Sequence, residues 1–200
     1  MTLRVEPADL EQTIAPLAEP VSLAEAKQHL RVDYDDDDAL IATQIAAARG
    51  WIEKELNISM VQRTYRAYLP QFADEINLPR PPFASLTSVQ YWSDESPQAL
   101  TTVAGLYEAD LRQGRLLRAY GEVYPSTAPR HDAVQITFVA GYAPDSNSPI
   151  NHAANVPAEL RAALLLILGD LYENRESSTP IKIEQMPTVK LLMNLHRQYR

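Results

Sequence analysis

The sequence has 200 residues and a mass of 22.4 kDa, which is enough for one domain with a hydrophobic core, or for one domain with an appendage. Hydrophobic residues make up 46% and charged residues 22%, as in folded rather than disordered proteins. The formal net charge of −8 argues against a protein that grips nucleic acid over most of its surface, because phosphate would be repelled. Cysteine is absent, which excludes disulfides, thiolate zinc sites and cysteine nucleophiles.

The sequence also argues against membrane insertion and secretion. Its longest apolar run, residues 162–168, is far shorter than the roughly 18 residues that span a bilayer. The N-terminus has no basic start followed by an apolar core, so we expect no secretory signal and a cytosolic site of synthesis. Fifteen prolines against six glycines predict stiff loops and arms rather than flexible linkers.

The beginning of the chain predicts an extended arm followed by a helix. Residues 1–20 show no sustained hydrophobic period and contain three prolines. Ser22 and Glu25 then have the spacing of a capping box, in which the serine caps a helix and the glutamate reaches back to the cap. We therefore predict a helix over residues 22–31.

A second helix is predicted over residues 36–57. The acidic run Asp35–Asp38 suits its first turn, because carboxylates there complement the positive end of the helix dipole. Asn57 suits its C-terminal end. Apolar residues recur between these ends with helical spacing, at Ile41, Ile45, Ala48, Ile52 and Leu56.

The pattern changes between residues 61 and 142. Short runs with period-two alternation are separated by prolines and glycines, which predicts roughly four to six short antiparallel strands. The most regular run is Val134–Val139, whose alternation places Val134, Ile136 and Phe138 on one face.

The C-terminal part is predicted to be helical again. Pro157 suits the first turn of a helix over residues 157–176, and the run Leu164–Leu168 within it is either core or a groove for a partner. A further helix is predicted within residues 188–200. The elements together predict an α+β fold, a helical core of about four helices with an antiparallel β region inserted between the second and the third. We expect an extended arm over residues 1–20, a main domain over residues 21–177 and a C-terminal tail over residues 178–200.

The sequence carries no recognised arrangement for catalysis or cofactor binding. Its glycines lack the spacing of a phosphate-binding loop, and its four histidines lack metal-ligand spacing on one helix. The run Asp35–Asp38 leaves two interpretations: the metal site of a divalent-metal-dependent enzyme, or a solvated helix start. The second is favoured, because four consecutive residues of a helical turn point in different directions and cannot converge on one ion. We expect no catalytic residue, no cofactor and no metal.

The C-terminal tail differs in charge from the rest of the chain. From Ser177 onward four basic residues oppose one acidic residue, Glu184, which gives a net charge of +3 and leaves −11 for the rest. A basic amphipathic helix on an acidic body fits a docking element, and it fits equally a helix packed on its own domain. The residues that would dock are Val189, Lys190, Leu192, Leu195, Arg197, Tyr199 and Arg200.

Several segments form an ordered set that covers roughly residues 19–177. They are Glu19–Asp33 with the acidic run after it, Ile76–Pro82, Ser88–Tyr91, Phe138–Tyr142, and Val156–Pro157 leading to Leu171–Glu176. This set resembles the head–tail connector (adaptor, or head completion) proteins of tailed bacteriophages and gene transfer agents.

The resemblance implies a structural virion protein and no enzyme activity. It implies a ring of about twelve copies that docks beneath the portal protein in the neck of the particle, after synthesis in the cytoplasm of the host bacterium. The ring would extend the DNA channel, let DNA pass without sequence-specific binding, and provide the platform for the next neck protein, a stopper or tail completion protein. No membrane is implied.

Within this resemblance, Asp35–Asp38 become candidates for acidic residues that face the lumen, and the C-terminal tail becomes a candidate for portal docking. Two alternatives stay open. One is a divalent-metal-dependent enzyme that uses Asp35–Asp38. The other is a packaging or assembly factor that never enters the particle.

Overall fold

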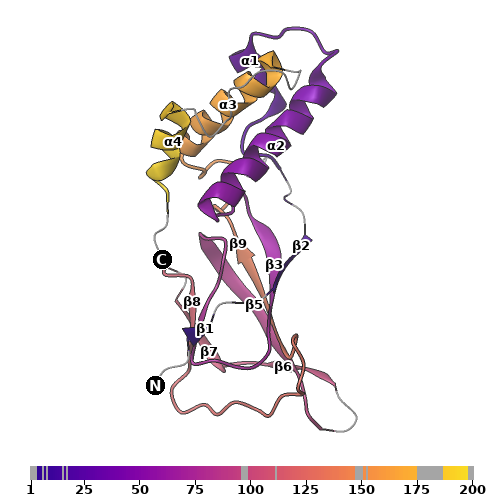
Figure 1. Ribbon diagram of the computed structural model, residues 1–200, viewed down its shortest axis with the longest axis vertical. Coiled ribbons are helices and arrows are strands. Elements are labelled where there is room, and N and C mark those ends of the chain that lie inside the picture. Colours follow the sequence, from indigo (N-terminus) through magenta and orange to yellow (C-terminus); the bar gives the residue numbers. More distant parts are fainter. Residues whose placement is uncertain are drawn as a thin grey trace. The chain divides into compact units, whose positions relative to one another are not determined.

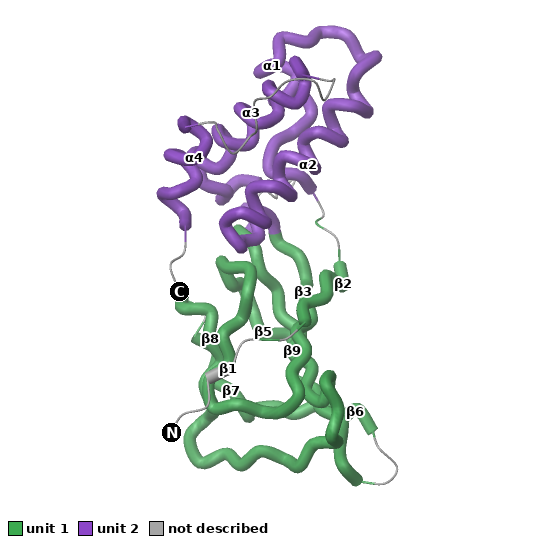
Figure 2. The backbone as a smooth tube through the Cα atoms, in the orientation of Figure 1, with its two compact units in different colours: residues 1–16, 62–142 green, residues 17–61, 143–200 purple. Residues whose placement is uncertain are grey.

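The structure is a computed structural model that describes residues 4–5, 7, 9–14, 16, 18–95, 99–110, 112–146, 151, 153–174 and 187–197. It confirms the predicted α+β fold, with a strand-rich region between the second and third helices (Figure 1). The chain forms two compact units (Figure 2): a β unit of residues 1–16 and 62–142, and a helical unit of residues 17–61 and 143–200. Both units are discontinuous, since the chain passes from each unit into the other and back.

The described part of the helical unit contains α1 (Leu23–Leu30), α2 (Asp38–Leu56), α3 (Ala158–Glu173) and α4 (Pro187–Asn194). α1 contacts α2 and α3, α2 packs against α3, and α4 packs on α3. The apolar stripe predicted for the second helix is the buried face of α2. The apolar run of α3 lies mostly in the core, although Leu166 is exposed. The buried residues of α3 include Leu160, Ala163, Leu164, Ile167 and Leu168.

The helix ends lie close to their predicted positions because their signals are local. The Ser22 Oγ accepts a hydrogen bond from the backbone N–H of Glu25 at 3.1 Å, as a capping box requires. The Glu25 carboxylate in turn accepts a bond from Arg161 Nη2 at 2.6 Å, so it ties α1 to α3. Asn57 ends α2 with φ 54°, a left-handed conformation that asparagine tolerates well.

The β unit holds two sheets. The five-stranded sheet has the order β2 (Asp9–Ile14), β3 (Arg63–Leu69), β9 (Val134–Ala140), β5 (Phe83–Trp92) and β6 (Leu100–Val103), with antiparallel neighbours. The four-stranded sheet has the order β1 (Arg4–Val5), β4 (Glu75–Asn77), β8 (Arg115–Arg118) and β7 (Tyr107–Asp110), with β1 parallel to β4. The described residues between α2 and α3 thus hold seven strands, more than the four to six predicted, because strands as short as β4 show no alternation.

The strand β2 lies within the segment for which the sequence predicts an extended arm. It pairs with β3 along the edge of the five-stranded sheet, from Asp9 opposite Tyr68 to Ile14 opposite Thr64. Five of its six residues are exposed. Hydrophobic alternation therefore could not reveal this strand, since it buries no face of its own.

The core of the β unit is built around β9 and a group of aromatic rings. Val134, Ile136 and Phe138 are fully buried, as their alternation predicts. Phe138 stacks on Tyr65 with ring centroids 5.7 Å apart, and Phe72 stacks on Tyr124 at 5.2 Å. Across the described residues of both units, no helix is both long enough and apolar enough to cross a membrane.

Candidate interaction surfaces

The acidic run predicted from the sequence lies in the loop that joins α1 to α2, and two of its four carboxylates are held by a lysine of α1. Lys27 Nζ donates to Asp35 Oδ1 at 2.6 Å and to Asp38 Oδ1 at 2.7 Å. The hydrogen bond from Lys27 lowers the pKa of Asp35, and the same bond raises the pKa of Lys27. One lysine therefore fixes both the start of α2 and the loop before it.

The third carboxylate, that of Asp37, is bound by two tyrosines. Tyr172 Oη of α3 donates to Asp37 Oδ2 at 2.6 Å, and Tyr34 Oη donates to the same oxygen at 3.3 Å. The two phenol oxygens are 2.9 Å apart. The bond to Asp37 raises the pKa of Tyr172, because an ionised phenol could no longer donate it. The loop is thus attached to α3 as well as to α1.

This geometry bears on the metal-site interpretation. The carboxylates of Asp35 and Asp38 face an ammonium group, and that of Asp37 faces two phenols. Among the described residues, no group of three or more histidine or carboxylate side chains is placed to hold a metal ion. The structure therefore favours the acidic run as a helix start and a charged surface.

The predicted docking residues fall into three sets. Val189 is fully buried and Leu192 is half-buried, so the apolar stripe lies partly against the helical unit itself. Lys190 and Leu195 are exposed, and Arg197 donates to Glu55 Oε1 of α2 at 2.8 Å. Tyr199 and Arg200 lie outside the described residues. The inner face of α4 thus packs on its own unit, which is the second of the two interpretations given for this tail.

The sequence pattern identified one of two exposed leucines at the C-terminal end of the described chain. Leu191 of α4 and Leu195, directly after α4, are 67% and 66% exposed and four residues apart. Leu195 is among the predicted docking residues, whereas Leu191 is not, because the predicted stripe passes through Val189 on the buried face.

A cleft of about 390 Å³ lies beside α4, where α4 approaches the C-terminal end of α2. Its described lining residues are Trp51, Glu55, Lys190, Met193, Asn194 and Arg197. The lining thus combines an aromatic ring and a thioether with two cations and one carboxylate. We call it the basic groove. The sequence alone could not indicate this groove, because its lining residues in α2 and near the C-terminus are far apart in the sequence.

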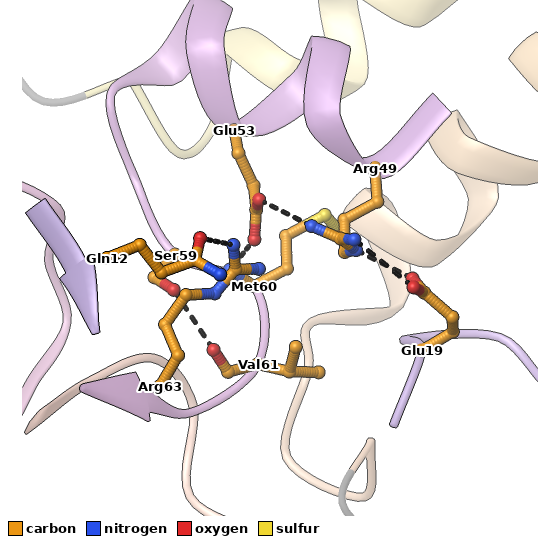
Figure 3. Close-up of polar contacts among 8 residues, drawn as sticks. All are labelled: Gln12, Glu19, Arg49, Glu53, Ser59, Met60, Val61 and Arg63. Atoms are coloured by element: carbon orange, nitrogen blue, oxygen red, sulfur yellow. Dashed lines mark hydrogen bonds and ion pairs between the residues drawn. The ribbon is translucent and has the colours of Figure 1, made fainter. Parts of the chain in front are cut away.

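The C-terminal end of α2 is fixed by an ion-pair network around Arg49 (Figure 3). Arg49 donates to Glu19 at 2.6 and 3.1 Å and to Glu53 Oε2 at 2.9 Å. The other oxygen of Glu53, a residue only 5% exposed, accepts the backbone N–H of Met60 at 2.8 Å. A buried glutamate therefore holds the chain as it leaves α2.

The β unit presents an exposed apolar loop between β8 and β9. Tyr120 and Val123 are 102% and 83% exposed. The base of the loop is fixed, because Tyr124 Oη donates to the backbone oxygen of Ala73 at 2.6 Å and its ring stacks on Phe72. Exposed apolar side chains beside a fixed residue are typical of a contact surface.

Two of the three comparisons with known proteins find matches. A family model described as "Phage gp6-like head-tail connector protein" matches residues 20–91. This range covers α1, α2 and the segment between them, together with β3, β4 and most of β5. A search of curated proteins finds no match.

Solved structures match almost the whole chain. A chain in the neck of an empty gene transfer agent particle, computed with C6 symmetry, is 25% identical with a TM-score of 0.75, over 96% of both chains. A chain in the virion of a native gene transfer agent particle gives the same values. A chain in the neck of a native particle, computed with C12 symmetry, is 24% identical with the same TM-score and coverage, and shows the shared fold.

These matches extend over both units of the chain, whereas the family model covers only the region from before α1 into β5. The resemblance predicted from the sequence is therefore confirmed: this chain is similar to the head–tail connector proteins of phages and gene transfer agents, by sequence over residues 20–91 and by fold over 96% of its length.

Proposed function

We propose that this protein is a structural virion component, a head–tail connector in the neck of a phage or gene transfer agent particle. The observation that carries the proposal is the match of 96% of the chain to chains of gene transfer agent necks and virions, at 25% identity. The matching family model, named for a head-tail connector, points to the same role.

We propose further that the protein forms a ring of about twelve copies. Two of the matched necks were computed with C6 and C12 symmetry, which supports a cyclic assembly with a multiple of six subunits. Such a ring would dock under the portal protein, extend the DNA channel and give the next neck protein, a stopper or tail completion protein, its platform. The protein would be made in the host cytoplasm before it enters the particle.

Portal docking is proposed for the C-terminal tail, as predicted from its charge. Val189 is buried on the inner face of α4, so its side chain is not available for contact with the portal protein. The exposed leucines of the described part of the tail, Leu191 in α4 and Leu195 directly after it, are available to a portal subunit. Tyr199 and Arg200 complete the proposed docking tail.

The acidic residues Asp35–Asp38 remain candidates for the channel wall. Carboxylates repel the phosphate backbone, so a lumen lined by them lets DNA slide past rather than adhere. The contacts of Lys27 and Tyr172 hold the loop in one conformation, which suits a fixed wall.

The proposal is tested by mass spectrometry of purified particles, followed by electron microscopy of the protein mixed with its portal. We expect the protein in mature particles at about twelve copies, and a ring seated on the portal. Absence from the particles would favour a packaging or assembly factor. Replacement of Asp35–Asp38 by asparagine tests the enzyme alternative, since loss of micromolar divalent-ion binding in calorimetry would favour it.

A further inference from the structure

Two surfaces of the helical unit carry opposite charges, and each also contains an aromatic side chain. One is the acidic loop between α1 and α2, here defined as residues 33–38. The other is the basic groove between α2 and α4. Both belong to the same compact unit, and both contain side chains whose charges have no partner on this chain within the described residues.

The acidic loop presents unpaired negative charge beside an exposed ring. Asp33 and Asp36 are exposed and form no ion pair among the described residues, unlike Asp35 and Asp38, which bind Lys27. Tyr34 lies between them in sequence and is 48% exposed, although its hydroxyl binds Asp37 and Tyr172. The loop therefore offers the face of an aromatic ring flanked by carboxylates.

The loop is also preorganised. It is held from α1 by Lys27 and from α3 by Tyr172, so little conformational entropy remains to be lost when it binds. A surface fixed in this way is suited to insertion into a groove of matching chemistry.

The basic groove offers the complementary chemistry. Lys190 stands at its edge, exposed and without an ion pair among the described residues, and Arg197 shares its charge with Glu55, itself exposed. The lining thus carries a net charge of +1 and includes two apolar side chains, Trp51 and the largely buried Met193. An aromatic ring can pack on such side chains, and the cations beside them attract both carboxylates and ring faces.

The two surfaces cannot meet within one molecule. The acidic loop ends at Asp38, the first residue of α2, whereas Glu55 of the basic groove lies in the last turn of α2. At 1.5 Å per residue, about 25 Å of helix separates them. A carboxylate of the loop can therefore reach Lys190 only in another copy of the chain.

We propose that the acidic loop of one copy docks into the basic groove of the next copy, with Tyr34 over Trp51 and Met193 and with Asp33 and Asp36 against Lys190 and Arg197. Such a contact is heterologous: each copy uses one surface and leaves the other for its next neighbour, so the contact repeats until a ring closes. The inference rests on the proposed ring and identifies the surfaces that build it. It assigns Lys190 and Arg197 to the subunit contact and leaves Leu191 and Leu195 to the portal. Asp36 then faces the neighbouring copy, so only the other carboxylates of Asp35–Asp38 stay candidates for the channel wall.

A disulfide cross-link tests this contact directly, because the natural chain has no cysteine. The full-length double variant Asp36→Cys with Lys190→Cys is oxidised mildly and separated on a denaturing gel. Each bridge would join two copies, since about 25 Å of helix within one copy is far beyond disulfide reach. We expect a ladder of covalent oligomers, and dimers at most from each single variant.

The matched control pairs Lys190→Cys with Asp94→Cys, a change at an exposed aspartate of the β unit that forms no ion pair among the described residues. We expect no ladder from this pair. A ladder of equal strength from control and test, or no ladder from the test variant, would overturn the proposal.

Charge reversal provides a second readout that needs no cross-link. Asp36→Lys and Lys190→Glu should each weaken self-association about tenfold or more in sedimentation velocity at low salt, because each places like charges together. The two changes combined in one chain should restore association, since the charges again match. Failure of the combined variant to recover, with both single variants folded, would overturn the proposal.

The outcome for this contact is separable from that for the proposed function. If the protein is present in particles as a ring but neither cross-link nor charge rescue occurs, the connector role stands and the subunit contact lies elsewhere. If the protein is absent from particles, the connector role itself fails.

Discussion

The two ends of α2 are both fixed by ionic contacts, but in different surroundings. At the N-terminal end, Lys27 binds Asp35 and Asp38 at the surface, and the Asp35 side chain is 89% exposed. At the C-terminal end, Arg49 bridges Glu19 and Glu53, and the Glu53 side chain is only 7% exposed. Exposed ion pairs contribute little to stability, whereas breaking a buried pair is costly. The first end is therefore suited to present a surface, and the second to hold the fold.

A substitution in the core of the helical unit should destabilise the protein more than any change at either end of α2. Leu164 of α3 is fully buried, so Leu164→Asp should prevent soluble folding at a cost of several kcal/mol. The matched control is Leu166→Asp two residues away, where the side chain is 38% exposed and the change should be tolerated. Soluble yield and thermal melting measure both. A wild-type melting curve for Leu164→Asp would contradict the position of α3 in the core.

The buried end of α2 should show the next largest effect. Arg49→Ala removes the guanidinium that binds the buried Glu53, which we expect to cost about 3 kcal/mol of unfolding free energy in urea titrations. Arg197→Ala removes an exposed pair with Glu55 and should cost less than about 1 kcal/mol. Equal losses for the two variants would mean that burial of Glu53 does not make its ion pair more costly to break than the exposed pair at Glu55.

The tie between the acidic loop and α3 should have a smaller effect. Tyr172→Phe removes the hydroxyl that donates to Asp37 and should destabilise the protein by about 1 kcal/mol. Tyr120→Phe, at a fully exposed position of the β unit, provides the control and should leave thermal stability unchanged. If Tyr172→Phe melts like the control, the loop does not depend on α3 for its conformation.

The exposed end of α2 should give the smallest effect, and it depends on pH. The pKa of Asp35 is lowered by Lys27, so the stability from this pair is complete above the ordinary aspartate pKa and is lost as the pH falls through the lowered value. NMR titration of Asp35 should show a pKa below about 3.9 in the native protein and near that value in Lys27→Ala. An identical titration in both proteins would show that the pair does not form in solution.

The elements that sequence patterns predicted are those with local signals. The cap at Ser22, the end at Asn57 and the buried stripe from Ile41 to Leu56 all lie within a few residues of the structure they specify. The alternation of β9 is similarly local. The family resemblance added the connector role, which no single motif of the chain carries.

The features that sequence patterns could not predict depend on residues far apart in the chain. The bond between Tyr172 and Asp37 joins positions 135 residues apart, and that between Arg197 and Glu55 joins positions 142 apart. The strand β2 owes its existence to pairing with β3 rather than to its own exposed side chains. The acidic run was visible in the sequence, but its contacts with Lys27 and Tyr172 and the basic groove were visible only in the folded chain.

The central claim is that copies of this chain form a ring in the neck of a phage-like particle. Electron cryomicroscopy of purified particles, averaged on the portal axis, tests it most directly. We expect a ring of about twelve copies next to the portal, with the acidic loop of each copy in the basic groove of its neighbour. A neck whose density accommodates no ring of this fold would contradict the connector role.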